Sequence, residues 1–261
     1  MEVLRKGRPA ALEAKTVGIM QPYYFPYLGY FSHISQCDAF ILHDIVKYTK
    51  RGWINRNRVL TQSGIATFTL SLDKAADECK IGERSVSESY DSKSQYRILE
   101  GAYRKAPYWF ELRGILPDLL AVGDRGLFVH LFQQVGKLCD LLEIRTPLSR
   151  SSRFSPLDGL KGQDLVIGIC EKIGAKSYLN PTGGEDLYSQ QDFDTHGLVL
   201  SFIEHVPRPY PQRVATQPDG VSPEFVERLS VLDSLAELGL EETKLRLRTD
   251  FNIRAPRRPG A

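Results

Sequence analysis

Residues 16–44 read TVGIMQPYYFPYLGYFSHISQCDAFILHD, and this stretch decides the fold. It opens with a short apolar run at residues 16–21 and closes with a second one at residues 38–44. Between them, residues 28–37 carry apolar side chains at the spacing of one helix face. An apolar strand, a helix and another apolar strand are typical of a parallel βαβ unit with a right-handed crossover. The stretch therefore predicts an α/β fold.

The same alternation of strands and helices returns later in the chain. Residues 177–180 and 198–203 are further short apolar runs, which predict two more strands. Residues 90–145 show helical periodicity instead, which indicates a helical insertion. We expect an open, mainly parallel, Rossmann-like sheet with flanking helices. The predicted boundaries are a disordered arm at 1–15, one α/β domain with its insertion at 16–250, and a disordered tail at 251–261.

Composition narrows the function classes. The chain has 261 residues, of which 42% are hydrophobic and 25% charged, which is ordinary for a globular protein. A net charge of +2 gives no overall sign of a nucleic-acid or membrane-surface protein. No apolar run approaches the length of a membrane span, and the start lacks the apolar centre of a secretory signal. The four cysteines form no C-x-x-C pair, so we expect a cytoplasmic protein without a structural metal.

Residues 20–30 follow the first predicted strand and contain four tyrosines, two prolines and a glycine. Ligands of open α/β sheets bind beyond the carboxyl ends of the strands. Tyrosine hydroxyls offer hydrogen bonds without charge. We therefore predict that Gln21, Tyr24, Tyr27 and Tyr30 line a binding site. The alternative is a rigid aromatic plug that closes the end of the sheet.

Residues 47–58, KYTKRGWINRNR, carry five positive charges and no acid in an otherwise balanced chain. Lysine and arginine bind phosphate, while a tryptophan ring stacks on a base or a sugar. A solvated basic loop and an RNA-binding patch are the alternatives. The prediction is an anion or nucleotide site that uses Lys50, Arg51, Trp53, Asn55, Arg56, Asn57 and Arg58.

A third segment, residues 180–188, follows another predicted strand. Gly183 and Gly184 would expose backbone N–H groups to an anion, and Glu185 could act as a base, a metal ligand or an amine binder. A tight turn that caps the next helix explains the same residues. His43 ends the second strand and could serve as a general base near neutral pH. We predict that all three segments and His43 line one cavity.

Together these motifs resemble the WbqC-like protein family. The resemblance covers residues from about 16 to 235, in the expected order. It implies a role in surface-polysaccharide biosynthesis, and glycine or aminoacyl transfer onto amino sugars has been suggested for this family. The motifs that carry it are QPYYFPYLGYF at 21–31, KRGWINRNR at 50–58, YLN at 178–180, GG at 183–184, LY at 187–188 and LSVLD at 229–233.

A more distant resemblance concerns the fold. A strand, then Gln-Pro, then an x-x-G-x turn that opens a helix is similar to the HxGH nucleotidyltransferases, which implies a nucleotidyltransferase-like sheet. There two histidines contact nucleotide phosphates. Here residues 27–30 read YLGY, so tyrosines stand where those histidines would be. Tyrosine cannot supply a cationic imidazolium, and the later phosphate motif is only echoed by SRSSR at 149–153.

The combined hypothesis is an acyl or aminoacyl transferase, or an amide-forming enzyme, that acts on an amine of a small anionic metabolite such as a nucleotide-linked amino sugar. His43 or Glu185 would take the proton of the amine, and Tyr27 belongs to the same catalytic set. We expect no membrane partner and no nucleic acid, apart from aminoacyl-tRNA as a donor. The alternatives are nucleotidyl transfer with ATP and Mg²⁺, held by Asp44 or Asp186, and a noncatalytic nucleotide- or RNA-binding module.

Overall fold

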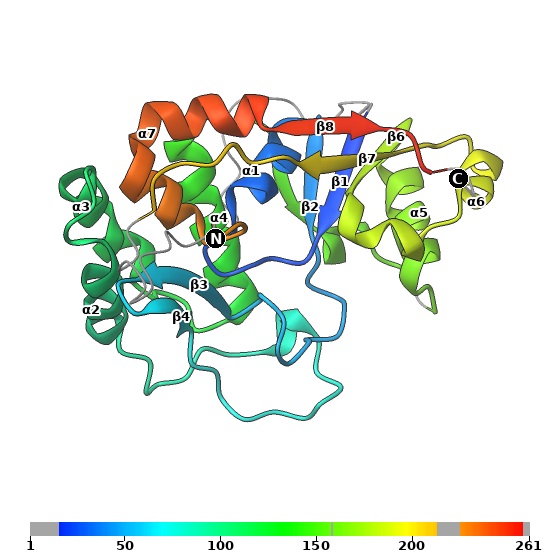
Figure 1. Cartoon of the computed structure of the whole chain (residues 1–261). Coiled ribbons are helices and arrows are strands. Elements are labelled where there is room, and N and C mark those ends of the chain that lie inside the picture. The colour runs from blue at the N-terminus through cyan, green and yellow to red at the C-terminus, as the bar shows by residue number, and fades with distance from the viewer. Residues whose placement is uncertain (1–15, 158, 213–224, 258–261) are drawn as a thin grey trace.

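The computed structural model describes residues 16–157, 159–212 and 225–257, so the arm expected at 1–15 and the last four residues lie outside it. A six-stranded sheet runs through the molecule in the order β5-β2-β1-β6-β7-β8 (Figure 1). Its first five strands are parallel, and β8 is antiparallel to β7. The predicted α/β fold is confirmed. The strands are β1 (Thr16–Met20), β2 (Ala39–Leu42), β5 (Leu148–Arg150), β6 (Ser177–Pro181), β7 (Val199–His205) and β8 (Phe251–Arg254).

Helices cover both faces of the sheet (Figure 1). One face carries α1 (Leu28–Ser35), α4 (Leu127–Leu141) and α7 (Val231–Thr249). The other carries α5 (Gly162–Ile173) and α6 (Gln190–Thr195). Gly18 in β1 lets α1 approach closely, since a Cβ there would lie 2.8 Å from the His33 ring.

A smaller unit lies beside this sheet on the α7 side. It contains a two-stranded hairpin of β3 (Arg56–Thr61) and β4 (Gly64–Thr69), followed by α2 (Ser92–Tyr103) and α3 (Trp109–Leu120). Helices α2 to α4 fall within the stretch where helices are expected. The basic segment at 47–58 is not loop throughout, since its last three residues begin β3. The reason is the tight turn before Gly64, whose φ of +109° suits glycine. Short 3₁₀ turns complete the fold at Ile81–Glu83, Ser151–Phe154 and Thr182–Leu187.

The C-terminal part corrects one expectation. Residues 251–254 form strand β8 on the edge of the sheet, where we expected a disordered tail. Helix α7 leads into it and bends at Gly239, whose φ is +77°. The Tyr108 ring occupies the space beside this glycine, because a Cβ there would lie 2.6 Å from the ring. The bend therefore ties α7 to the start of α3.

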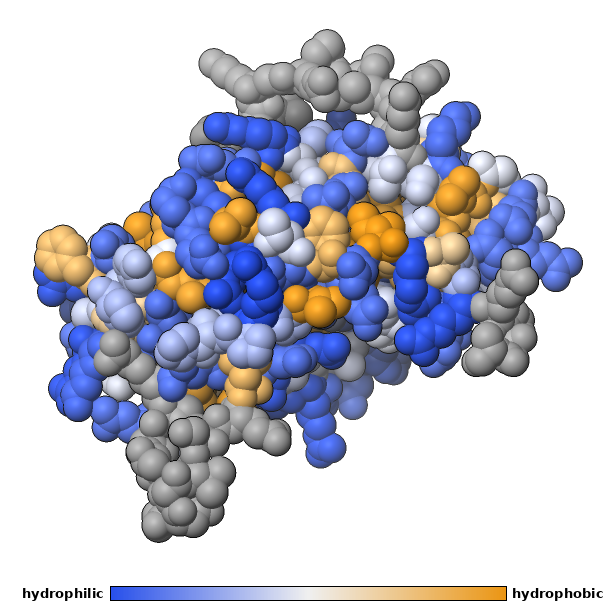
Figure 2. All heavy atoms as spheres, turned by 45° about the horizontal axis from the view of Figure 1, so that its top comes forward, coloured by the Kyte–Doolittle hydropathy of each residue, from blue (hydrophilic) through white to orange (hydrophobic). Residues whose placement is uncertain are grey.

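The surface over α7 and β8 mixes apolar with hydrophilic side chains (Figure 2). Leu245, Ile253 and Val206 are about half exposed. Single apolar residues of this kind are ordinary on a protein surface, so they mark no interface. Within the described parts of the chain, no helix is long and apolar enough to cross a membrane.

The order of the strands locates a binding edge. The chain first builds outward from β1 through β2 to β5, then returns to the other side of β1 with β6 and β7. The direction of winding thus reverses between β1 and β6. In open α/β sheets, ligands bind beyond the carboxyl ends of the strands at such a point. That edge is the candidate site.

Candidate functional site

The parallel strands bring several predicted residues to one edge of the sheet. Gln21 follows β1 and His43 follows β2, and the His43 N–H donates to the carbonyl of Met20 at 2.8 Å. The Gly183–Gly184 turn follows β6, which pairs with the other side of β1. The basic segment also reaches this edge, because the Tyr24 N–H donates to the Trp53 carbonyl at 3.0 Å.

Two of the predicted tyrosines are internal. Tyr24 and Tyr30 are fully buried. The Tyr30 hydroxyl donates to the Gln21 carbonyl at 3.0 Å, and the Tyr24 hydroxyl lies 3.3 Å from that of Tyr90. Burial raises the pKa of both phenols well above the ordinary value. These two side chains therefore build the loop, while Gln21 and Tyr27 reach its surface.

The two asparagines of the basic segment also serve the fold. Asn57 is buried, and its amide donates to the carbonyls of Tyr24 at 3.0 Å and Phe25 at 2.6 Å. It thereby holds the Phe25 turn, whose φ is +46°. Asn55 accepts from the Tyr48 hydroxyl at 2.7 Å and donates to the carbonyl of Leu70, just after β4, at 2.9 Å. Composition alone could not show that these amides point inward.

The positively charged side chains of the basic segment differ in their partners. Lys50 forms an exposed ion pair with Asp77. Arg56 donates to the carbonyls of Arg51 and of Gly52, the latter at 3.1 Å. Trp53 is 38% exposed, and the guanidinium of Arg58 lies 5.2 Å from its ring centre. The guanidinium of Arg56 also lies over this ring, 5.9 Å from its centre, so Trp53 is packed among cations, while Arg51 is exposed.

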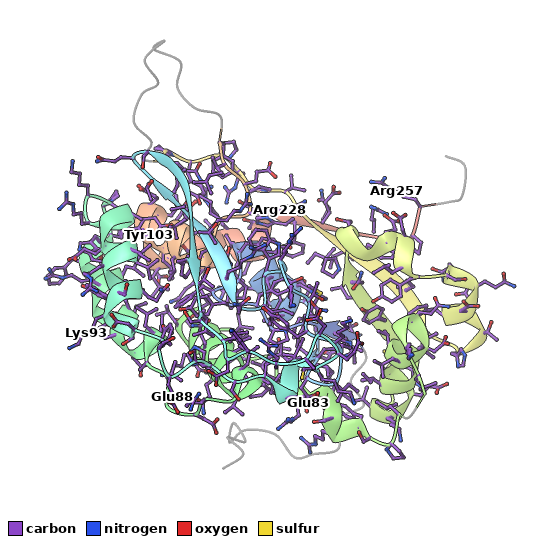
Figure 3. The ribbon with its side chains drawn as sticks, turned by 90° about the horizontal axis from the view of Figure 1, so that it is seen from below. Glu83, Glu88, Lys93, Tyr103, Arg228 and Arg257 are labelled. Carbon is purple, nitrogen blue, oxygen red and sulfur yellow. The ribbon has the colours of Figure 1, made fainter. Side chains whose placement is uncertain are left out.

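Arg228 lies at the candidate site, although no sequence motif indicated it. Arg58 donates to its carbonyl at 3.5 Å, and the Val231 N–H donates to the Pro26 carbonyl at 2.9 Å. These contacts place Arg228 between the hairpin and the sheet (Figure 3). Its guanidinium is close enough to lower the pKa of both Tyr27 and His205, although burial is the larger influence on each. Arg228 directly precedes the motif at 229–233, but the letters of that motif do not indicate where its side chain lies.

His205 stands at the carboxyl end of β7 and meets the same group of residues. Its ring lies edge-on to Tyr27, with ring centres 5.7 Å apart. Both ring nitrogens are buried without a hydrogen-bond partner. Burial lowers the pKa of His205 to about 4, Asp250 opposes this shift and Arg228 adds to it. The ring is therefore neutral near pH 7.

A second polar cluster joins the ends of β2 and β5. Asp44 is 3% exposed and accepts from the hydroxyls of Ser151 at 2.8 Å and Ser152 at 2.6 Å. The Ser152 N–H and Arg150 Nε each donate to it at 2.8 Å. Burial would raise the pKa of Asp44, but these hydrogen bonds outweigh it and hold the pKa below the usual range. The donors at the end of β5 thus bind an internal carboxylate.

His43 lies next to this carboxylate. It is 8% exposed, and its Nδ1 is buried without a hydrogen-bond partner. Burial lowers the pKa of His43 to about 4, while Asp44 opposes the shift. The unused nitrogen can take up a proton, but with a pKa of about 4 His43 is a weaker base near pH 7 than an ordinary histidine.

The Gly183–Gly184 turn is shaped by its neighbours. A Cβ on Gly184 would lie 2.6 Å from the Asn180 amide nitrogen, so glycine is needed there. Glu185 accepts from two nitrogens of Arg254, at 2.8 and 2.5 Å, and from the Arg257 N–H at 2.8 Å. The hydrogen bonds from Arg254 lower the pKa of Glu185 to about 2. In this arrangement Glu185 fastens β8 to the turn and is a weak base.

An open, mainly parallel sheet with helices on both faces and a reversal of winding between β1 and β6 places the chain among the doubly wound α/β proteins. The chain belongs to the WbqC-like protein family, whose model matches residues 21–245. It is 28% identical to the uncharacterized protein Rv1507c of Mycobacterium tuberculosis (strain ATCC 25618 / H37Rv) over 230 residues, which cover 87% of this chain and 95% of that one. No solved structure matches it.

Proposed function

We propose that this protein is a transferase that joins an acyl or aminoacyl group, such as glycyl, to an amine of a small activated metabolite such as a nucleotide-linked amino sugar. Membership of a family linked to biosynthesis supports an enzymatic role. The amine nitrogen forms a bond to the acyl carbon as the bond from that carbon to its leaving group breaks. The proton of the amine passes to a base on the protein.

One observation carries the proposal: His43 keeps an unpartnered ring nitrogen at the carboxyl end of a central strand. Because it is neutral near pH 7, it can accept the proton of an attacking amine without first losing one. The carboxylate of Asp44 favours the protonated form that results. Gln21 and Tyr27 offer polar groups at the same edge, and Trp53 offers a flat face to a nucleotide ring.

The test is a direct search for the amide product. The protein is incubated with an acyl thioester, an aminoacyl adenylate or aminoacyl-tRNA as donor and with nucleotide-linked amino sugars as acceptors, and the products are weighed by mass spectrometry. An N-acetylated acceptor serves as the negative control, because it lacks the attacking amine. Amide is expected from at least one pair, and His43→Gln should lower kcat by about 10²- to 10⁴-fold. The matched control is His196→Gln, an exposed histidine paired with Glu171.

Nucleotidyl transfer is measured in the same experiment by adding ATP and Mg²⁺ and following pyrophosphate. The residues at the edge do not fit this metal well. Asp44 is a candidate ligand, yet its carboxylate is surrounded by donors from Arg150, Ser151 and Ser152. Release of pyrophosphate with a nucleotide-linked product would replace the proposal. Binding of nucleotides without any turnover would make the protein a binding module instead.

A further inference from the structure

We infer that Arg228 and His205 form the binding site for a phosphate group at the entrance to the candidate site. This inference deepens the proposed function. It rests on that function in one respect only, which is that the bound phosphate is taken to be part of the substrate. The sequence motifs do not include Arg228, whereas His205 lies just after the predicted strand at 198–203 and was expected to face the same opening. The two come from the segment before α7 and from the end of β7, and they meet at the first turn of α1.

Arg228 is an exposed cation held in a strained backbone conformation. Its φ of +57° is unusual for a residue other than glycine. The segment is fixed from both sides, because the Ser230 N–H donates to the Arg58 carbonyl at 3.0 Å and Arg58 donates to the Arg228 carbonyl. Because Arg228 is exposed, its guanidinium can meet an anion from solution, and the fork of an arginine suits a phosphate.

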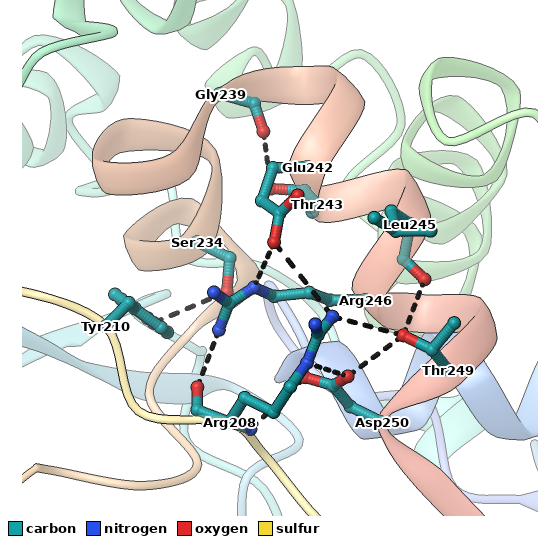
Figure 4. Close-up of polar contacts among 10 residues, drawn as sticks. All are labelled: Arg208, Tyr210, Ser234, Gly239, Glu242, Thr243, Leu245, Arg246, Thr249 and Asp250. Carbon is teal, nitrogen blue, oxygen red and sulfur yellow. Dashed lines mark hydrogen bonds and ion pairs between the residues drawn. The ribbon is translucent and has the colours of Figure 1, made fainter.

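His205 offers two further hydrogen-bonding atoms. Its ring is held between Tyr27 and Gly29, and neither nitrogen has a partner. The charged groups that face it are Arg228 and Asp250, and Asp250 is already bound by Arg208 Nε at 2.7 Å (Figure 4). A buried polar atom without a partner is unfavourable. An anion at Arg228 would satisfy one of these nitrogens once the ring moves enough to expose it.

The first turn of α1 adds to the attraction for an anion. Tyr27 occupies the N-cap position but provides no side-chain hydrogen bond, and no acidic residue lies in the first turn. A helix N-terminus carries a partial positive charge. Tyr27 and His205 both lie against Gly29 in this turn. The N-terminus of α1 therefore attracts an anion, as Arg228 and His205 do.

The chemistry selects phosphate over carboxylate. Arg228 alone neutralises one negative charge, whereas the diphosphate of a nucleotide-linked sugar carries two and inorganic phosphate carries between one and two near pH 7. The second charge is met if His205 takes up a proton when the anion binds. A dianion nearby favours the charged imidazole, so phosphate should raise the pKa of His205 from its low value in the free protein. A singly charged carboxylate should have a much smaller effect.

The experiment follows the imidazole of His205 by NMR in the full-length protein with ¹³C-labelled histidine, assigned with His205→Asn. Inorganic phosphate, pyrophosphate and acetate are titrated at constant ionic strength. Phosphate and pyrophosphate should raise the pKa of His205 by about one unit or more and should bind at least about tenfold more tightly than acetate. Arg228→Gln should abolish the difference. Arg153→Gln, an exposed arginine at the end of β5, should leave it intact.

Three results would overturn the inference: no response of His205 to either phosphate, an equal response to acetate, or an unchanged response in Arg228→Gln. The fold of each variant is checked from its remaining histidine signals. These signals do not depend on turnover. Phosphate binding without any amide product would therefore contradict the proposed reaction but support the phosphate site. Amide formation without a response of His205 would support the reaction and contradict the site.

Discussion

A methyl group on Gly29 would lie 2.6 Å from both Cβ and Cγ of His205. The helix that follows β1 and the end of β7 are therefore in direct contact through these two residues. Real Cβ atoms do not approach this closely, so only glycine fits this position without a shift of backbone or ring. The contact couples the first turn of α1 to the histidine of the proposed phosphate site.

Gly29→Ala should push His205 and the end of β7 away from α1. Overpacking a buried contact of this kind costs about 1–3 kcal/mol, which urea denaturation measures directly. The NMR signal of His205 should move as well. Gly101→Ala is the matched control, since a Cβ at that helical position meets nothing within 4 Å and should stabilise by up to about 1 kcal/mol. Equal effects at the two glycines would contradict the packing argument.

The central sheet could be predicted because its signal is local. The apolar runs at residues 16–20 and 39–42 each lie within one strand, and the helix between them shows its own period. Strand β8 could not be found in this way. Its polar-looking sequence, FNIR, is held by β7 and by the contact of Arg254 with Glu185, which is 69 residues away in the chain.

For the candidate site, the sequence predicted which segments lie at the edge of the sheet, but not which way their side chains point. Gln21, His43 and the Gly183–Gly184 turn do share an edge, because parallel strands end together. The direction of each side chain depends on distant partners, however. Asn57 turns inward to meet Phe25, and Arg228 reaches the edge only through Arg58. Neither contact leaves a trace in the local sequence.

Asp44→Asn should destabilise the join between β2 and β5. Removing one partner of a buried ion pair costs about 3–5 kcal/mol, but Arg150 is 47% exposed and regains water, so we expect about 2–3 kcal/mol. In the folded protein the pKa of Asp44 lies below the usual value of an aspartate. The stability that Asp44 contributes is therefore complete above the usual pKa, and it is lost as the pH falls through the lower, folded pKa. Urea denaturation should show the wild type and the variant converging below about pH 4. The exposed Asp186→Asn should show no such change, and a constant gap down to about pH 2 would contradict the assignment.

Glu185→Gln and Arg254→Gln should both loosen β8, and the double variant should lose little more stability than either single variant. This non-additivity is expected because the two side chains act as one contact. The pKa of Glu185 is about 2, so the contact with Arg254 should be complete above about pH 4.5 and should weaken as the pH falls from there towards 2. Hydrogen exchange of the β8 amides follows the loosening. In the amide-forming assay, a loss confined to Glu185→Gln would instead support its predicted role as a base.

The arginines of the basic segment should separate into one that binds and one that also holds the fold. Arg51 is exposed, so Arg51→Gln should change the free energy of unfolding by less than about 0.5 kcal/mol. If it contacts the substrate anion, affinity should fall by roughly 10- to 150-fold, and Arg51→Lys should restore only part of the loss.

Arg56 differs, because it donates to the carbonyls of Arg51 and Gly52 and so closes a turn in which Arg51 has a φ of +69°. Arg56→Gln should therefore lower stability by about 1–2 kcal/mol in urea denaturation, and calorimetry with pyrophosphate should show a loss of affinity that follows from the displaced Arg51. Unchanged stability with lost affinity in Arg56→Gln would show that this guanidinium contacts the anion itself.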